Sequence, residues 1–242
     1  MGELLGSGDQ CDDETFINKG VTEDFAPVLI KRAESIIDRA GDEFKAVFLA
    51  EYRRLMAARL GSKDPRATSL SPESLLSTWL DVLESLELDF NQSFRKLSSL
   101  KTTELGSEDE RKAAAGRFFH HEGVSASGET DGSARGKMGQ WLERWREQMI
   151  ADWGEGQEAD DARETAMNSV NPKFIPKNWI LDELIDRVER KDEREILGRV
   201  MHMALHPFDD QVSGDTSMQD EYERFCGDVP KIGRAMQCSC SS

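Results

Sequence analysis

The chain has 242 residues, with 31 basic and 47 acidic side chains and a formal net charge of −16 at pH 7. Most of such a surface repels a polyanion, so the composition excludes a generally basic nucleic-acid-binding protein. The acidic residues concentrate in residues 1–24, 152–164 and 209–228, which we interpret as solvated connectors and ends. No apolar run approaches the roughly 18 residues of a membrane-spanning helix. We therefore expect neither nucleic acid nor a membrane as partner.

The two ends of the sequence lack targeting and lipid-attachment signals. The start has neither the basic segment of a secretory signal nor the Arg-rich bias of a transit peptide. Cys240 is third from the end, whereas a prenylation motif needs a cysteine fourth from the end. Three of the four cysteines, Cys226, Cys238 and Cys240 but not Cys11, lie near the C-terminus. This distribution is not a disulfide framework and favours a reducing compartment, or a tail with redox chemistry of its own.

The first 60 residues divide into a polar lead-in and a helical segment. Residues 1–24 show no apolar period and are predicted to be a disordered lead-in. From Phe25 to Leu60, apolar residues recur every three or four positions, the spacing of one helix face. The pattern predicts one long helix, or two joined near Gly41, that stops at Gly61.

The middle of the chain is less regular. Helices are expected over residues 72–86 and 90–97 on the same apolar spacing. Residues 101–136 are rich in Gly, Ser, Glu and Lys and contain a run of three alanines. We interpret them as a flexible surface insertion, in which Phe118 and Phe119 form the one apolar spot dense enough to dock locally.

Helical spacing returns over residues 138–153. Trp141, Trp145 and Trp153 lie near one face of this helix, which is typical of an aromatic-rich core stripe rather than of a ligand platform. A short helix to Val170 is expected to follow it.

Two more helices are predicted toward the C-terminal end. They cover residues 179–188 and 196–205, and we expect Asp192 to cap the second of them. No stretch alternates apolar and polar residues long enough to predict a strand. The predicted fold class is therefore all-α, a helical bundle with a disordered N-terminus and surface insertions.

Nucleotide-binding motifs are missing from the sequence. It has no Gly-x-x-x-x-Gly-Lys-Ser/Thr loop and no kinase-type His-Arg-Asp or Asp-Phe-Gly, the elements that hold phosphates and magnesium in those classes. We assign no catalytic, cofactor-binding or metal-binding residue to this chain.

Two weak metal motifs are present. His202 and His206 are four residues apart, close enough on a helix to share a zinc ion, with Cys226 as the one further ligand in view. A zinc protease would need a glutamate where Met203 stands, so we favour two histidines at a helix end. Residues 209–220 resemble a calcium loop but lack its usual charged and bidentate ligands, and we interpret them as a polar, glycine-containing loop.

The C-terminal thiols are the most unusual chemistry in the sequence. A cysteine on an exposed end ionises and reaches partners, whereas a buried one does neither. Cys240 and Cys238 are therefore redox candidates, the alternative being a pair of idle tail thiols. We predict that Cys240 is alkylated faster than Cys226, which lies among the packing candidates Tyr222 and Phe225.

Several blocks of the sequence carry a family resemblance. They are Phe48–Gly61, Asp89–Ser98, Asn171–Trp179, His206–Phe208, Tyr222 and Val229–Ser242. In this order they resemble the C-terminal part of the selenoprotein O family, the pseudokinase-fold protein adenylyltransferases. The resemblance covers about residues 25–242, with 101–136 and 212–219 as insertions.

This resemblance implies an activity for the intact family protein. The family transfers AMP from ATP, with magnesium, to Ser, Thr or Tyr hydroxyls of protein substrates, in mitochondria or the cytoplasm. It also implies that the helices correspond to the C-terminal helical part of a protein-kinase-like fold. Cys240 falls on the family's redox-active cysteine or selenocysteine, and Cys238 stands where valine is common.

The resemblance also limits the function of this chain. The family's nucleotide-binding and catalytic residues belong to an N-terminal half that this sequence does not contain, so we expect the chain to be inactive alone. The alternative is a non-catalytic helical interaction module with a redox-active tail, which binds a separate N-terminal half or another protein. A zinc or calcium protein is the third hypothesis.

Overall fold

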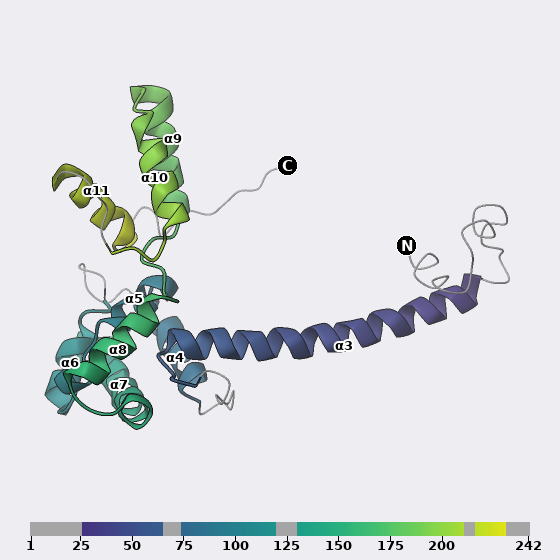
Figure 1. Cartoon of the computed structure of the whole chain (residues 1–242), viewed down its shortest axis with the longest axis horizontal. Coiled ribbons are helices and arrows are strands. Elements are labelled where there is room, and N and C mark those ends of the chain that lie inside the picture. Colours follow the sequence, from purple (N-terminus) through teal and green to yellow (C-terminus); the bar gives the residue numbers. More distant parts are fainter. Residues whose placement is uncertain (1–25, 65–73, 120–129, 211–215, 231–242) are drawn as a thin grey trace. The chain divides into compact units, whose positions relative to one another are not determined.

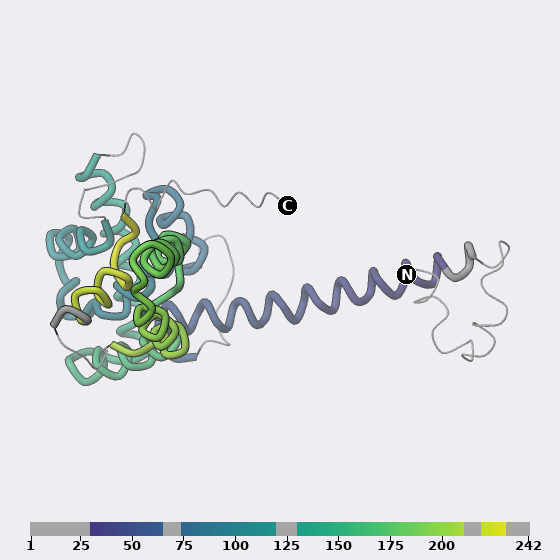
Figure 2. The backbone as a smooth tube through the Cα atoms, turned by 90° about the horizontal axis from the view of Figure 1, so that it is seen from above, coloured from purple at the N-terminus to yellow at the C-terminus, as the bar shows by residue number. Residues whose placement is uncertain are grey.

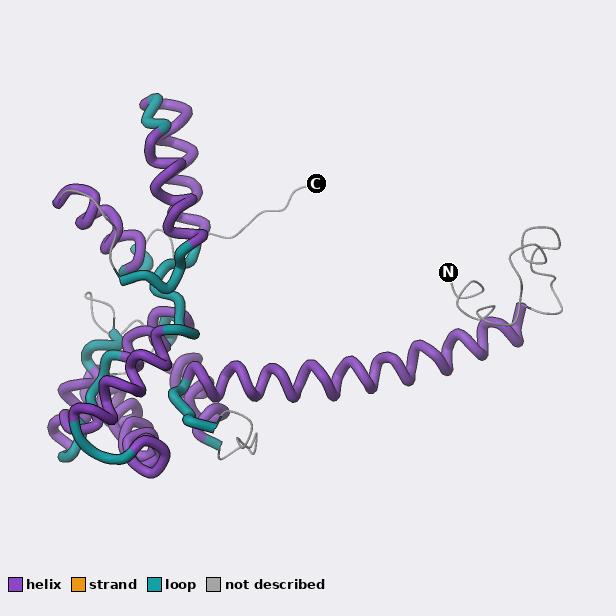
Figure 3. The backbone as a smooth tube through the Cα atoms, viewed as in Figure 1, coloured by secondary structure: helices purple, strands orange, loops and turns teal. Residues whose placement is uncertain are grey.

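The computed structural model describes residues 26–64, 74–119, 130–210 and 216–230. In these ranges the chain forms helices joined by loops and contains no strand (Figure 3). None of the described helices combines the length and the apolar content that crossing a bilayer requires. The lead-in predicted for residues 1–24 lies outside the described residues. The chain divides into two units, Met1–Arg53 and Arg54–Ser242.

Helix α3 spans Ala26–Arg59 and supplies the described part of the N-terminal unit (Figures 1 and 2). It passes through Gly41 without a break. Of the two predicted alternatives, one long helix is therefore confirmed and two helices joined near Gly41 are not. Three rings on it stack in sequence, with centroids 5.9 Å apart for Phe44 and Phe48 and 6.1 Å apart for Phe48 and Tyr52. These rings contact one another along the helix, with Phe44 and Phe48 exposed to solvent and Tyr52 partly buried.

The C-terminal unit contains the other described helices, several of which start at short polar residues. They are α4 (Leu75–Ser85), α5 (Phe90–Ser98), the 3₁₀ turn η2 (Thr102–Glu104), α6 (Glu108–Ala115), α7 (Asp131–Trp153), α8 (Gln157–Asn168), α9 (Asn178–Lys191), α10 (Glu195–Leu205) and α11 (Thr216–Cys226). Ser74, Asp89 and Thr130 each accept a hydrogen bond from the backbone N–H three residues later. Such caps satisfy donors that a helix start leaves unpaired.

Trp79 lies at the centre of the first core of this unit. Its ring is fully buried and meets Phe94 and Phe118 edge-on, with centroids 5.9 Å and 5.8 Å away. The Trp141 ring is 4.2 Å away. The predicted tryptophan stripe is confirmed for Trp141 and Trp145, which are both buried.

Trp153, at the C-terminal end of α7, stabilises the turn that follows α3. Trp153 donates Nε1–H to the carbonyl of Gly61 at 2.7 Å. Gly61 has a φ of +91°, and a Cβ there would lie 2.8 Å from the Met167 sulfur and 3.0 Å from the Met149 sulfur. Only glycine suits both the backbone and the space, so the helix end predicted at Gly61 is confirmed.

The prediction of a flexible insertion over residues 101–136 is wrong. Most of the described residues in this segment form η2, α6 and the start of α7, and α6 packs against α7. Leu105, Ala114 and Ala115 are buried, as are Phe118 and Phe119. Two of the three alanines, Ala114 and Ala115, are therefore packing residues, whereas Ala113 is exposed. Residues 120–129 of the segment lie outside the described residues.

The predicted single helical bundle is also wrong. The chain divides into two units, and helices α9, α10 and α11 enclose a hydrophobic cluster of their own within the C-terminal unit. The apolar spacing used for the prediction identifies helix faces but not which faces meet. Asp192 was expected to cap α10, but it ends α9 with a left-handed φ of +55°.

A buried ion pair anchors the loop between α5 and η2. Asp160 and Arg163, on α8, have side chains that are each 1% exposed and lie 3.2 Å apart. Asp160 accepts hydrogen bonds from the backbone N–H of Thr102 at 2.9 Å and from its hydroxyl at 3.1 Å. Arg163 donates to the carbonyls of Ser98 and Leu100. Part of the acidic stretch 152–164 is therefore core, although its charge indicated a solvated connector.

We predict that Asp160→Asn lowers the free energy of unfolding by about 3–5 kcal/mol, because it leaves the buried Arg163 without a countercharge. The matched control is Asp161→Asn on the same helix, whose carboxylate is 57% exposed and pairs with Lys101. The control should change stability far less, since exposed ion pairs contribute little. Urea denaturation of both variants measures the difference. Equal losses would contradict a structural role for the buried pair.

Candidate functional site

The redox candidates Cys238 and Cys240 lie outside the described residues. Their predicted reactivity therefore remains a prediction. The described cysteine, Cys226, lies at the end of α11 and is buried.

The two histidines lie close together at the end of α10, His202 in its last turn and His206 directly after it. The ring centroids of His202 and His206 lie 4.5 Å apart, and both side chains are exposed. In the ranges that the structure describes, no three His, Cys, Asp or Glu side chains gather in a way that would hold a metal ion. Cys226, the third zinc ligand considered, is enclosed by apolar side chains instead.

The described part of the acidic loop makes contacts within the protein. The Asp210 carboxylate accepts a hydrogen bond from Arg95, and its carbonyl accepts one from Lys173 at 2.8 Å. The carbonyl of Asp209 accepts the hydroxyl proton of Tyr222. Residues 211–215 lie outside the described residues, so the loop as a whole remains untested as a cation site.

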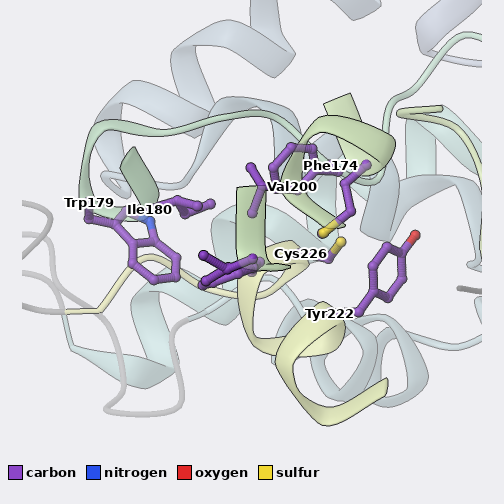
Figure 4. Close-up of a cluster of buried hydrophobic side chains, with 9 residues drawn as sticks. Phe174, Trp179, Ile180, Val200, Tyr222 and Cys226 are labelled. Atoms are coloured by element: carbon purple, nitrogen blue, oxygen red, sulfur yellow. The ribbon is translucent and has the colours of Figure 1, made fainter. Parts of the chain in front are cut away.

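Nine buried residues from α9, α10, α11 and the segment before α9 form what we term the C-terminal cluster (Figure 4). They are Phe174, Trp179, Ile180, Ile196, Val200, Met203, Tyr222, Phe225 and Cys226. Trp179 and Phe225 meet edge-on with centroids 5.8 Å apart. Arg224 fastens α11 to α9 from outside by donating two hydrogen bonds to Glu183.

The environment of Cys226 makes its thiol unreactive. Burial raises the pKa of this thiol from its ordinary value of 9.0 to about 11 because a thiolate is poorly solvated in an apolar cluster. Burial also raises the pKa of Tyr222, which shares a hydrogen bond with the thiol. Since the thiolate is the nucleophile, Cys226 is a packing residue in this fold.

Three blocks that are distant in sequence meet at what we term the motif junction, formed by Asp89–Ser98, Asn171–Trp179 and His206–Phe208. The backbone N–H groups of Lys173 and Phe174 donate to the carbonyl of Pro207 at 2.7 Å and 3.1 Å. Gln92 Nε2 donates to the carbonyl of Lys173 at 3.3 Å. The blocks that carried the family resemblance are therefore neighbours in the fold.

The side chain of Asn171 is the most completely bonded group of the motif junction. It is fully buried and accepts a hydrogen bond from Arg59 Nε at 2.9 Å. Its amide nitrogen donates to the Arg59 carbonyl at 2.8 Å and to the Ser98 hydroxyl at 3.2 Å. One side chain thus joins the end of α3, the end of α5 and the segment after α8.

Charged side chains complete the motif junction. Arg95 donates to the carbonyls of Asn168 and Asn171, at 3.2 Å and 2.8 Å, as well as to Asp210. Lys177 pairs with Asp89 at 2.7 Å, where both side chains are largely buried. These groups bind polypeptide, so the junction positions helices and does not itself supply a reactive group. The sequence patterns gave no sign of Arg95 or Asn171 beyond their membership of the resembling blocks.

The cavity between α6 and α7 does not fit a nucleotide triphosphate. It measures about 490 Å³ and is lined by both acids and bases. Arg111 donates to the carbonyls of Leu105 and Gly106 and to Glu143, and Lys112 pairs with Glu108 at 2.6 Å. These cations are neutralised within the protein, so they do not offer the positive charge that a triphosphate requires. We derive no step of ATP chemistry from the described residues.

Comparison with known proteins places the chain in a family. The family model described as protein adenylyltransferase SelO matches residues 20–205. The chain belongs to the SelO family. A protein nucleotidyltransferase YdiU from Maridesulfovibrio salexigens is 28% identical over 202 residues, which cover 81% of this chain and 35% of that relative. The mitochondrial protein adenylyltransferases SelO of Saccharomyces cerevisiae and Schizosaccharomyces pombe are each 24% identical, covering 88% and 99% of this chain and 39% and 40% of their own lengths.

The matches cover most of this chain but less than half of each relative. The chain spans two fifths or less of the length of these SelO and YdiU relatives. The family match includes α3, the first core and most of the motif junction. The predicted family membership is therefore confirmed, and the described residues correspond to a part of the SelO family protein.

We predict that Asn171→Asp destabilises the protein by about 1–3 kcal/mol, because a carboxylate leaves the partly buried Arg59 carbonyl and the buried Ser98 hydroxyl without their donor. Asn91→Asp is a matched control, since Asn91 uses only its carbonyl oxygen toward Arg59 Nη2, at 3.0 Å. A carboxylate preserves that acceptor, so the control should cost less. Thermal or urea unfolding checks this, and an equal cost at both positions would argue against the bridging role of Asn171.

We predict that at pH 8 native Cys226 reacts with iodoacetamide at least ~10-fold more slowly than the same thiol in urea, because burial keeps it protonated. Cys240 should react faster than Cys226 in the native chain.

The raised pKa of Cys226 also stabilises the fold below about pH 9, and this contribution is lost as the pH rises toward 11. Cys226→Ala should therefore lose less stability over that range. Site-resolved mass spectrometry and urea titrations at each pH measure these effects.

Proposed function

We propose that this chain is the C-terminal helical portion of a SelO-type protein adenylyltransferase, and that it does not transfer AMP on its own. The observation that carries the proposal is the family match over residues 20–205 in a chain that spans only 35–40% of its relatives. The intact protein would transfer AMP from ATP to protein Ser, Thr or Tyr hydroxyls. ATP and magnesium would then be bound by residues outside this sequence.

In this proposal the chain acts as a scaffold. Its buried polar groups, Asp160 with Arg163 and Asn171 with Arg59, bond to backbone and to one another. Such groups hold helices in a defined arrangement, and their hydrogen bonds leave them unsuited to substrate binding. Helices fixed in this way would present a constant surface to the catalytic part.

A second candidate function is a non-catalytic interaction module with a redox-active tail at Cys238 and Cys240. The observation that favours it is the exposure of large apolar side chains on α3, among them Phe44 at 71%. Exposed apolar surface of this kind marks sites of protein association. The two functions differ in whether AMP transfer accompanies association.

We predict that the purified chain transfers no AMP when incubated with ATP, magnesium and a protein acceptor, because the cations that line the cavity between α6 and α7 are already paired within the protein. The full-length Schizosaccharomyces pombe relative serves as the positive control in the same assay. Intact-mass analysis of the acceptor detects the added AMP. Transfer by the isolated chain at a rate comparable to the control would refute the proposed function.

A further inference from the structure

An apolar stripe runs along the exposed side of α3. We term it the α3 stripe, and its members are Ile30, Ile37, Phe44, Val47 and Phe48. Ile30, Ile37 and Phe44 are seven residues apart, and Val47 and Phe48 follow Phe44 by three and four residues, which places all five on one side of a helix. Phe44 and Val47 are 71% and 70% exposed. The helical period places Arg39 and Asp42 on the opposite side of α3.

The exposure of the α3 stripe is unusual for a helix of this composition. Between Ile30 and Arg53, Ala33 is the one buried side chain. Helices in proteins gain most of their stability from packing an amphipathic face rather than from intrinsic propensity. Phe44 and Phe48 stack on each other but remain 71% and 54% exposed, so most of their apolar surface gains nothing from burial. The sequence of α3 is therefore that of a helix with a packing partner.

A second exposed stripe, on α10, differs in this respect. Leu197, Met201 and Leu205 are exposed, but the other face of α10 contributes Ile196, Val200 and Met203 to the C-terminal cluster. That helix already has a core to stabilise it. The N-terminal part of α3 has none among the described residues of its unit, so it depends most on a partner.

The family comparison indicates the nature of that partner. All five residues of the α3 stripe lie inside the range matched by the SelO family model, so the helix belongs to the family's common structure. In the matched relatives, 60–65% of their own length lies outside the part that this chain covers. A packing surface for a helix of the common structure is expected within the same structure.

We propose that the α3 stripe docks on an apolar surface of the part of the SelO family protein that this chain lacks. The inference rests on the proposed function, because it assumes that such a part exists as the partner. It adds the surface and its residues: an apolar face centred on Phe44 and Phe48. Docking buries the stripe and leaves Arg39 and Asp42 in solvent.

The test compares thiol protection in two full-length contexts. Val47→Cys places a thiol on the α3 stripe, and Asp42→Cys places one on the opposite side. Each is introduced into this 242-residue chain and into a chimera, in which the chain replaces its aligned segment of the Schizosaccharomyces pombe relative. Site-resolved mass spectrometry measures alkylation at each position separately from the native cysteines.

We expect the thiol from Val47→Cys to react at least ~10-fold more slowly in the chimera than in the isolated chain, because docking excludes the reagent. The thiol from Asp42→Cys should react at the same rate in both. Adding Phe44→Gln and Phe48→Gln to Val47→Cys should restore fast alkylation in the chimera. The matched pair Arg39→Gln and Asp42→Gln, which also leaves net charge unchanged, should not.

Equal rates for the Val47→Cys thiol in both contexts would overturn the proposal. Protection that already exists in the isolated chain and grows with its concentration would assign the surface to a second copy, which also overturns it. AMP transfer by the chimera is measured separately. Protection without AMP transfer supports docking and counts against the proposed function. AMP transfer without protection supports the proposed function and overturns the docking proposal.

Discussion

The arrangement of the C-terminal unit depends on the buried side chain of Asn171. Its amide bonds to Arg59, at the end of α3, and to Ser98, at the end of α5. An asparagine suits this position because one amide offers both an acceptor and two donors. A buried polar group left unpaired costs more than a bond contributes, so the three segments are held in one register. Arg95 extends the same network to Asp210 and the start of the loop after α10.

Local patterns in the sequence were sufficient for most helices and insufficient for their packing. Apolar spacing located α3, α4, α5, most of α7, α9 and α10. It did not locate α11, which falls in a stretch interpreted as a solvated, acidic end of the chain. Composition misled the interpretation of residues 101–136, because polar residues there cover a buried face. A local signal was available in Ser107 and Glu110, which form a reciprocal capping box at the start of α6. The alanines after them indicated a helix with a small-residue face rather than a flexible stretch.

The groups that position the site were the hardest to predict from sequence. Asp160 lies in an acidic run that resembles a solvated surface, and its burial depends on Thr102, 58 residues away. Asn171 and Arg59 are 112 residues apart. No local period reports such pairings, because they depend on which helices meet. The family resemblance did identify the blocks that form the motif junction, although it did not indicate that they touch.

The two units differ in what their side chains lack. In the C-terminal unit, the buried side chains of Asp160 and Asn171 are hydrogen-bonded, and the aromatic side chains of α4, α5 and α7 fill a core. In the N-terminal unit, large apolar side chains remain exposed along α3. The C-terminal unit also exposes apolar side chains on α10, but that helix has a second face buried in the C-terminal cluster. The α3 stripe has no such core among the described residues of its unit, which is expected where the remaining packing is made with another polypeptide segment. The docking proposed for the α3 stripe follows from this difference.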